Sequence, residues 1–136
     1  MAPRVGASNA GAEGDAVVRE VCAAFEQYER ALIEHDIQAL NGFFLNSPDS
    51  IRYGIAEQNY GIEAIAAYRR ASVPVHHERR LLRTVVTSYG PDVACVSAEF
   101  TDPATAGLGR QTQTWVRTSA GWKIAVAHVS VSSAAR

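Results

Sequence analysis

The sequence predicts a single α+β domain in which helices come first and an antiparallel sheet follows. Two observations support this prediction. Over residues 16–36, apolar residues recur at steps of three and four, as they do on amphipathic helices. After Pro74 the apolar residues alternate with a period of two, and turn residues separate the runs, which is typical of strands. Helices followed by a meander of strands define the α+β class.

The size and charge of the chain exclude several classes of protein. With 136 residues, of which 47% are hydrophobic, it has the length of one domain and enough apolar surface for a core. The formal net charge is -1 and there is no basic stripe, so neither nucleic acid nor an anionic membrane surface is an expected partner. No apolar run is long enough to cross a bilayer. Cys22 and Cys95 lie in apolar runs, which favours free thiols in a reducing compartment, and we expect a cytoplasmic protein.

The helical half is predicted from stripes and caps. Residues 1–14 are rich in small residues and lack a signal-peptide core, so we expect a disordered leader followed by a domain over 15–136. Asp15 is a favourable N-cap for a helix over 16–36, whose stripe includes Tyr28. Asp36 is expected to cap a second helix over 37–44. A short strand over 50–55 and a third helix over 62–72 follow.

The strand half predicts a sheet that is covered on both faces. Four strands are expected over residues 79–89, 92–101, 110–118 and 122–132. In the second and fourth of these strands both faces are largely apolar, whereas a sheet with one solvated face alternates cleanly. Helices can cover one face only. A second copy of the chain would cover the other, so we expect a homodimer.

The last strands carry a resemblance to a known superfamily. The segment TWVRTSAGWKIAVAHVS, together with FEQYERALIEHD in the first helix, resembles the SnoaL-like members of the nuclear-transport-factor-2-like superfamily. That resemblance implies a cone in which N-terminal helices pack on a curved antiparallel sheet around one internal pocket. The same scaffold hosts isomerases, dehydratases, hydrolases and non-catalytic proteins, so the resemblance implies a fold and leaves the chemistry open.

A narrower resemblance involves several segments in order: YERALIEHD, SIRYGIAEQNYGIEAIAAYR, RTVVTSYG and GRQTQTWVRT with GWKIAVAHVS. They resemble the AtzH/HpxZ family and together span residues 18–132. Members of that family occur alongside amidases in the breakdown of cyanuric acid and oxalurate. Their best-understood activity is a decarboxylating amidohydrolase that converts 1,3-dicarboxyurea to allophanate. The resemblance therefore implies a cofactor-free hydrolase of a small carboxylated urea or amide, in functional association with an amidase.

The resemblance places the two catalytic residues of that family at Tyr28 and Arg52. Tyr28 lies on the apolar stripe of its helix, so its hydroxyl points inward and needs a partner or a ligand. An arginine in the same cavity would hold a substrate carboxylate in its planar fork and would favour the phenolate. Tyr28 would then protonate the leaving nitrogen or activate water. The alternatives are a core tyrosine and, because Ile51 and Tyr53 alternate with it, a solvated Arg52.

Four further residues are candidates for substrate binding: Arg69, Gln113, Trp115 and His128. Arg69 would be a second carboxylate clamp, although tandem arginines on a helix are more typical of a solvated surface. Gln113 shares a strand face with Trp115, and its amide would hydrogen-bond a urea carbonyl. His128 has the same strand parity as Trp122, so we expect it inside the cone, with a core histidine bonded to backbone as the alternative.

No motif in the sequence indicates a metal or an organic cofactor. His76, His77 and Glu78 are adjacent residues without a partner cluster, and there is no nucleophile elbow or phosphate loop. Catalysis is therefore expected to be acid–base and electrostatic. Two other functions stay open. One is a non-catalytic dimeric module that binds a small carboxylate or helps an amidase to assemble. The other is an isomerase or dehydratase with Glu99 as the general base inside the cone.

Overall fold

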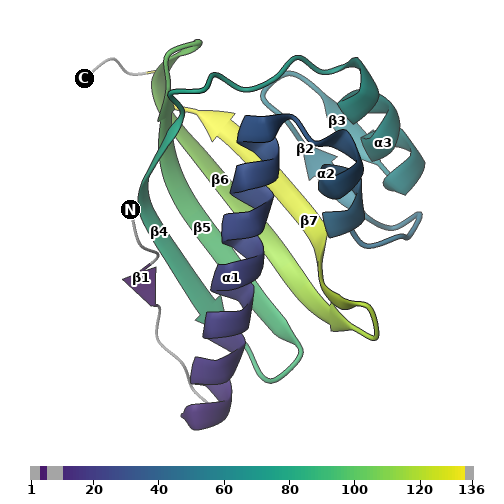
Figure 1. Ribbon diagram of the computed structural model, residues 1–136, viewed down its shortest axis with the longest axis vertical. Coiled ribbons are helices and arrows are strands. Elements are labelled where there is room, and N and C mark those ends of the chain that lie inside the picture. The colour runs from purple at the N-terminus through teal and green to yellow at the C-terminus, as the bar shows by residue number, and fades with distance from the viewer. Residues whose placement is uncertain (1–3, 6–10, 134–136) are drawn as a thin grey trace.

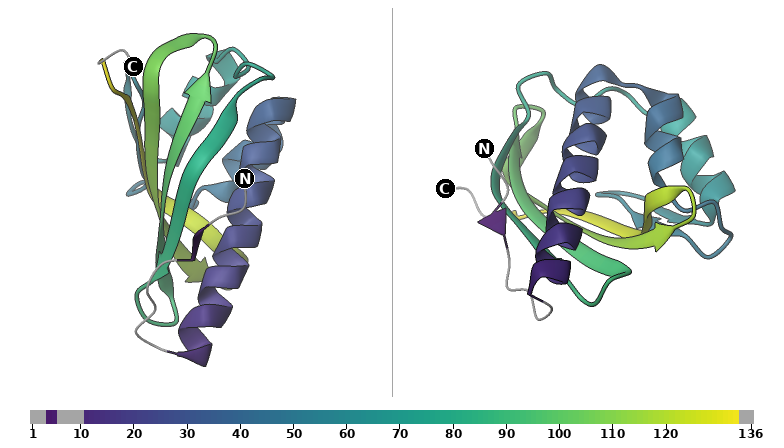
Figure 2. Two further views of the ribbon diagram at one scale, coloured as in Figure 1. Left: turned by 90° about the vertical axis from the view of Figure 1, so that its left-hand side faces the viewer. Right: turned by 60° about the horizontal axis from the view of Figure 1, so that its bottom comes forward.

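Three helices cover one side of a curved, open sheet (Figures 1 and 2). This computed structural model describes residues 4–5 and 11–133 of the chain. The sheet has seven strands in the order β1-β4-β5-β6-β7-β2-β3. It is mixed, because β1 pairs with β4 and β2 pairs with β7 in parallel, whereas the other pairs are antiparallel. The predicted α+β architecture is confirmed, whereas the expectation of a wholly antiparallel sheet is wrong for these two pairs.

The helices are α1 (Ala12–Glu34), α2 (Ile37–Phe43) and α3 (Ile62–Ala71). The strands are β1 (Arg4–Val5), β2 (Ile51–Tyr53), β3 (Gln58–Tyr60), β4 (Arg80–Ser88), β5 (Val93–Asp102), β6 (Thr105–Thr118) and β7 (Gly121–Val131). The four predicted C-terminal strands are present, and β6 begins five residues before the expected residue 110. Neither β1 nor β3 was predicted, because two or three residues give only a weak periodic signal.

The first helix begins earlier than its sequence signal. Asp15 was expected as the N-cap, but α1 begins at Ala12 after Gly11 and has no side-chain cap. Asp15 lies instead in the first turn, where a carboxylate favours the helix dipole. Of the expected leader, residues 1–3 and 6–10 lie outside the described residues. Asp36 caps α2 as predicted, with its side chain accepting a hydrogen bond from the backbone N–H of Ala39 at 3.1 Å.

The hydrophobic core lies between the helices and the concave face of the sheet. α1 packs on β4 and β5, α2 packs on β7, and α3 packs against β2 and β3. The apolar stripe of α1, exemplified by Val21 and Phe25, is fully buried against Val96 and Trp115 in the sheet. None of the described helices covers the outer face of the sheet (Figure 2). None of them is long and apolar enough to span a membrane.

A β-bulge in the last strand reverses the direction of its side chains. Ile124 and Val126 pair with consecutive residues of β6, so Ala125 has no partner across the ladder. One extra residue shifts the alternation of the strand to the opposite face. Ile124 and Ala127 are therefore buried on the concave face, whereas Val126 and His128 are exposed on the outer face. The prediction that His128 lies inside the cone is wrong for this reason.

Candidate functional site

A cavity of about 210 Å³ opens between α1, α3 and the concave face of the sheet. Its walls come from segments far apart in the chain, including the turn between β2 and β3. Drug-sized ligands occupy pockets of roughly 300–1,000 Å³, so this cavity suits a smaller molecule. The charged and larger polar side chains in its lining are Tyr28, Arg52, Glu57, Tyr68, Arg69, Arg79, Asp102, Gln111 and Gln113.

Tyr28 lies deep in this cavity, as the stripe on α1 predicted. Its residue is 4% exposed, and its ring packs edge-on against Phe43 and Phe44 of the neighbouring helix. The hydroxyl oxygen accepts a hydrogen bond from Nη2 of Arg69 at 3.3 Å. Among the described residues no acceptor is bonded to the hydroxyl hydrogen. The phenol can therefore donate its own proton to a ligand while a cation supports its oxygen.

Arg69 reaches the cavity from α3 and is not on a solvated surface, although its neighbour Arg70 is. The residue is only 6% exposed, and its Nε atom is buried without a hydrogen-bond partner. No acidic side chain of the described residues forms an ion pair with it. A buried charge without a counter-charge costs several kcal/mol. The Arg69 guanidinium is thus a strong candidate to bind an anionic group of a ligand.

Arg52 enters the same cavity from the sheet and is 7% exposed. It faces inward because β2 pairs in parallel with β7, with Arg52 opposite the buried Ala127. Its Nη1 atom donates to Glu57 at 2.8 Å and to Asn59 at 3.1 Å. The Tyr68 ring lies 4.0 Å from its guanidinium carbon, in a cation–π contact. Solvation of Arg52, the expectation from strand alternation alone, is therefore wrong.

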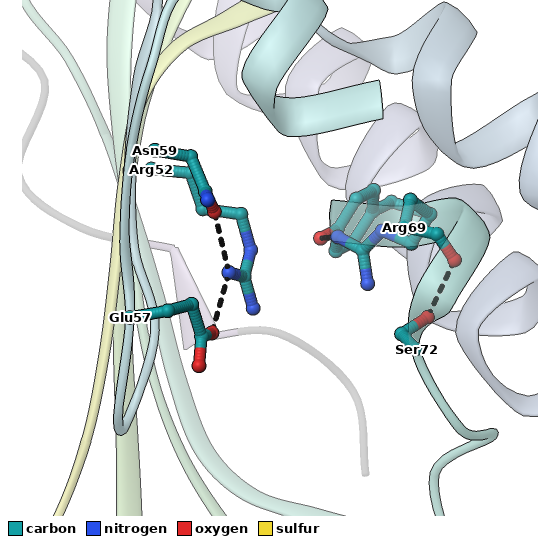
Figure 3. Close-up of polar contacts among 6 residues, drawn as sticks. Arg52, Glu57, Asn59, Arg69 and Ser72 are labelled. Atoms are coloured by element: carbon teal, nitrogen blue, oxygen red, sulfur yellow. Dashed lines mark hydrogen bonds and ion pairs between the residues drawn. The ribbon is translucent and has the colours of Figure 1, made fainter. Parts of the chain in front are cut away.

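The two arginines approach the cavity from opposite walls. In Figure 3 Arg52 extends from the sheet with Glu57 and Asn59, while Arg69 extends from α3 above Ser72. Arg52 already has a carboxylate partner on one of its nitrogens, and its Nη2 has no partner among the described residues. A small molecule between them would meet two planar forks and one phenol. This arrangement can bind carboxylate groups and deliver a proton.

Gln113 lines the cavity, as predicted, but Trp115 does not. Trp115 is fully buried behind it, and its indole N–H donates to the Gln113 side-chain oxygen at 2.9 Å. Trp115 therefore does not contact a ligand in this cavity directly.

Two other candidates lie on the outer face of the sheet. His128 packs edge-on against Tyr53, with 5.5 Å between ring centroids, and has no access to the cavity. Glu99 lies between the buried Ala98 and Phe100 and points away from the helices. The isomerase or dehydratase hypothesis thereby loses its proposed general base.

Several residues of the site were missed in the sequence. Glu29 is a buried carboxylate on α1 that holds Arg79 through two hydrogen bonds of 3.1 and 3.2 Å. It also accepts a hydrogen bond from Gln111 at 2.8 Å. Arg79 in turn covers the ring of Phe100 at 3.9 Å. The position of Glu29 directly after Tyr28 on α1 is only a weak sign that its side chain is buried. Gln111 could have been found because it is two residues before Gln113 and therefore faces the same side of the sheet.

The histidine pair after α3 does not form a metal site in the described part of the chain. The rings of His76 and His77 stack at 4.5 Å between centroids, and His77 lies near Glu78 at the surface. Among the described residues, no group of three histidine, cysteine, aspartate or glutamate side chains is placed to hold a metal ion.

The arrangement of helices on a curved sheet is similar to that of nuclear-transport-factor-2-like proteins. A superfamily member from Salmonella enterica serovar Typhimurium LT2 has a TM-score of 0.72, 18% identity, and coverage of 88% of this chain and 94% of that chain. At this identity the likeness concerns the fold alone.

The chain belongs to the AtzH-like family, whose profile matches residues 12–135. A cystatin-like fold protein from Burkholderia xenovorans LB400 is 55% identical, with a TM-score of 0.83 over 85% of this chain and 92% of that chain. A protein of unknown function from Pectobacterium atrosepticum SCRI1043 is 44% identical, with a TM-score of 0.83 over 87% and 92%. The comparison with curated proteins found no match. The predicted fold and family are both confirmed.

Proposed function

We propose that this protein is a cofactor-free cytoplasmic hydrolase of a small carboxylated urea or amide, with Tyr28 and Arg52 as its catalytic residues. The choice of 1,3-dicarboxyurea as the type of substrate follows from the resemblance to the AtzH/HpxZ family described above. One observation carries the proposal: a buried phenol accepts a hydrogen bond from the unpaired cation Arg69 in a cavity that also holds Arg52. This is the arrangement that proton delivery to a small anion requires.

The proposed reaction removes an N-carboxyl group. Arg69 holds this group beside Tyr28, while the free Nη2 of Arg52 holds a second carboxylate at the opposite wall. The C–N bond breaks and its electron pair stays on nitrogen, where it takes the proton from the Tyr28 hydroxyl. Carbon dioxide leaves, and the nitrogen becomes the amide or urea NH₂ of the product. The phenolate, stabilised by Arg69, recovers its proton from water, which leaves hydroxide.

The direct test is the decay of 1,3-dicarboxyurea with purified protein, followed by the appearance of allophanate. We expect faster decay than in buffer, and a loss of about 100-fold or more in kcat for Tyr28→Phe, because general-acid catalysis contributes 10²–10⁴-fold. Tyr60→Phe is the matched control, since Tyr60 is exposed and lies outside the cavity. If the wild-type protein does not accelerate the decay, the hydrolase proposal fails.

A second candidate function is a non-catalytic dimeric module that binds a small carboxylate or associates with an amidase. The outer face of the sheet favours it, since half-buried Val93, Cys95 and Val116 and the exposed Val126 form a surface that no described helix covers. We propose that two copies pair through this face. Light scattering should then give a dimer for the wild type and a monomer for Val126→Glu. Under this candidate an amidase co-purifies equally with wild type and Tyr28→Phe, without turnover.

A further inference from the structure

Two glutamines stand side by side in the wall of the cavity. Gln111 and Gln113 are two positions apart on β6, so their side chains emerge on the same concave face. Both line the cavity, and they are 4% and 3% exposed. A buried amide has one acceptor and one donor group, and leaving either unsatisfied costs free energy. The hydrogen-bond partner that each amide already has therefore determines whether its donor or its acceptor group remains free for a ligand.

Gln113 is held by its oxygen. The indole N–H of Trp115 can only donate, so the atom it meets at 2.9 Å must be the carbonyl oxygen of the Gln113 amide. The Gln113 NH₂ group has no partner among the described residues. Gln113 thus offers a hydrogen-bond donor to the cavity.

Gln111 is held at the opposite end of its amide. The carboxylate of Glu29 can only accept, so the atom that meets it at 2.8 Å must be the nitrogen of Gln111. Two hydrogen bonds from Arg79, one to each carboxylate oxygen, fix the position of Glu29 itself. The Gln111 carbonyl oxygen has no partner in the described part of the chain. Gln111 thus offers an acceptor beside the donor of Gln113.

We propose that this pair recognises one amide or urea group: Gln113 donates to its carbonyl oxygen and Gln111 accepts from its N–H. Residues two apart on a strand are about 6.8 Å apart, which a small amide with a hydrogen bond of about 2.9 Å at each end can span. Trp115 and Glu29 are positioning residues that act through the glutamines. The inference rests on the proposed function only in taking the same cavity as the ligand site.

The test uses two monoanions of nearly equal shape. Malonamate has a carboxylate and a primary amide, whereas acetoacetate has a methyl group in place of the NH₂. Calorimetry on the full chain should show malonamate binding about tenfold more tightly, because acetoacetate leaves the Gln111 oxygen unpaired. Gln111→Leu should remove this preference. Gln113→Leu should weaken both ligands by a similar factor of about ten. Gln58→Leu, on exposed β3, should change neither affinity.

The positioning role of Trp115 is tested by a double-mutant cycle. Trp115→Phe removes the N–H, so it should weaken both ligands when Gln113 is present and have no effect in the Gln113→Leu background. A merely structural tryptophan would weaken binding equally in both backgrounds. Thermal unfolding and retained malonate binding by each variant check that the chain is folded.

Two results would overturn the inference. One is equal affinity of the wild type for malonamate and acetoacetate, and the other is an additive effect of Trp115→Phe and Gln113→Leu. If either occurs while 1,3-dicarboxyurea is still turned over, only the role of the glutamines is lost. If neither ligand binds and there is no turnover, the cavity is not the ligand site and both proposals fail.

Discussion

The two walls of the cavity differ in how their arginines are compensated. Arg52, on the sheet side, has Glu57 at 2.8 Å, Asn59 at 3.1 Å and the face of Tyr68. Arg69, on the α3 side, has a phenol at 3.3 Å and no carboxylate among the described residues. Both are more than nine-tenths buried. The comparison indicates that the fold itself neutralises one cation and leaves the other for a ligand.

Because of this difference, the two arginines are expected to have different roles in binding. A buried guanidinium with a carboxylate partner is satisfied before a ligand arrives, so an incoming anion gains little charge compensation from it. A guanidinium without such a partner gains the full compensation from the ligand. We therefore expect Arg69 to supply most of the affinity for an anionic group, and Arg52 to orient the molecule and complete the site.

The largest effect is expected for Arg69→Gln. Removing one partner of a buried charge pair costs about 3 kcal/mol or more, which corresponds to roughly a 100-fold loss of malonate affinity. The turnover of 1,3-dicarboxyurea should fall by at least the same factor, because the phenolate loses its cation. Calorimetry measures the malonate affinity, and a substrate-decay assay measures the turnover. Arg70→Gln, on the exposed side of α3, should behave as wild type. Unchanged malonate binding by Arg69→Gln would refute the comparison.

A smaller loss is expected for Arg52→Lys. The substitution keeps the positive charge but removes the planar fork, so one of two hydrogen bonds to a carboxylate is lost. Turnover should decrease by about tenfold to 30-fold, while malonate binding through Arg69 should change less than threefold. Steady-state kinetics and calorimetry measure the split. A loss of malonate affinity equal to that of Arg69→Gln would show that the two walls are equivalent.

Glu57→Gln is expected to have the opposite effect from the arginine substitutions, namely tighter malonate binding. The change keeps the shape of the side chain at position 57 but removes the negative charge that neutralises Arg52. A ligand carboxylate then no longer competes with Glu57 for the Arg52 guanidinium. Malonate affinity should rise by about threefold to tenfold, because charged hydrogen bonds contribute about 1.5–3 kcal/mol and the substituted amide retains part of one. Glu63→Gln, an exposed glutamate on α3, controls for the change in net charge. Unchanged malonate affinity would mean that Glu57 does not compete with ligand.

The smallest effect concerns the stability of the ligand-free protein. Replacing a buried, unpaired charge by a neutral side chain is expected to raise the free energy of unfolding, by about 1 kcal/mol for Arg69→Gln. Arg52→Gln should instead lower it, since it leaves Glu57 and Asn59 without their donor. Urea denaturation of both variants gives the two signs. Destabilisation of similar size in both would contradict the unpaired state of Arg69.

Much of the fold was predictable from periodicity. The stripe on α1 predicted that Tyr28 faces the interior, and Asp36 predicted the start of α2 through its capping hydrogen bond. Both are local signals, because helix period and capping depend on residues within a turn of one another. The four long strands were predicted from the period-two alternation of their apolar residues. The segments that resemble AtzH/HpxZ proteins predicted the family.

The site was less predictable, since its chemistry depends on partners far apart in sequence. Arg69 and Tyr28 are 41 residues apart. The spacing of Arg69 from the buried Ile65 places it on the inner side of α3, but no local pattern shows that it meets Tyr28. His128 was misplaced because one bulge at Ala125 changes which face a strand presents, and such a bulge leaves no periodic mark. Gln111 acquires its role only through Glu29, 82 residues away.

Local order in the chain was thus enough to predict the three helices, β2 and the four long strands, the buried side of α1, and the family to which the protein belongs. Only the folded arrangement decided which arginine lacks a carboxylate, which end of each glutamine amide is free, and which face His128 occupies. The physical reason is range: helix and strand periods act over a few residues, whereas charge compensation and hydrogen-bond polarity depend on contacts across the whole sheet.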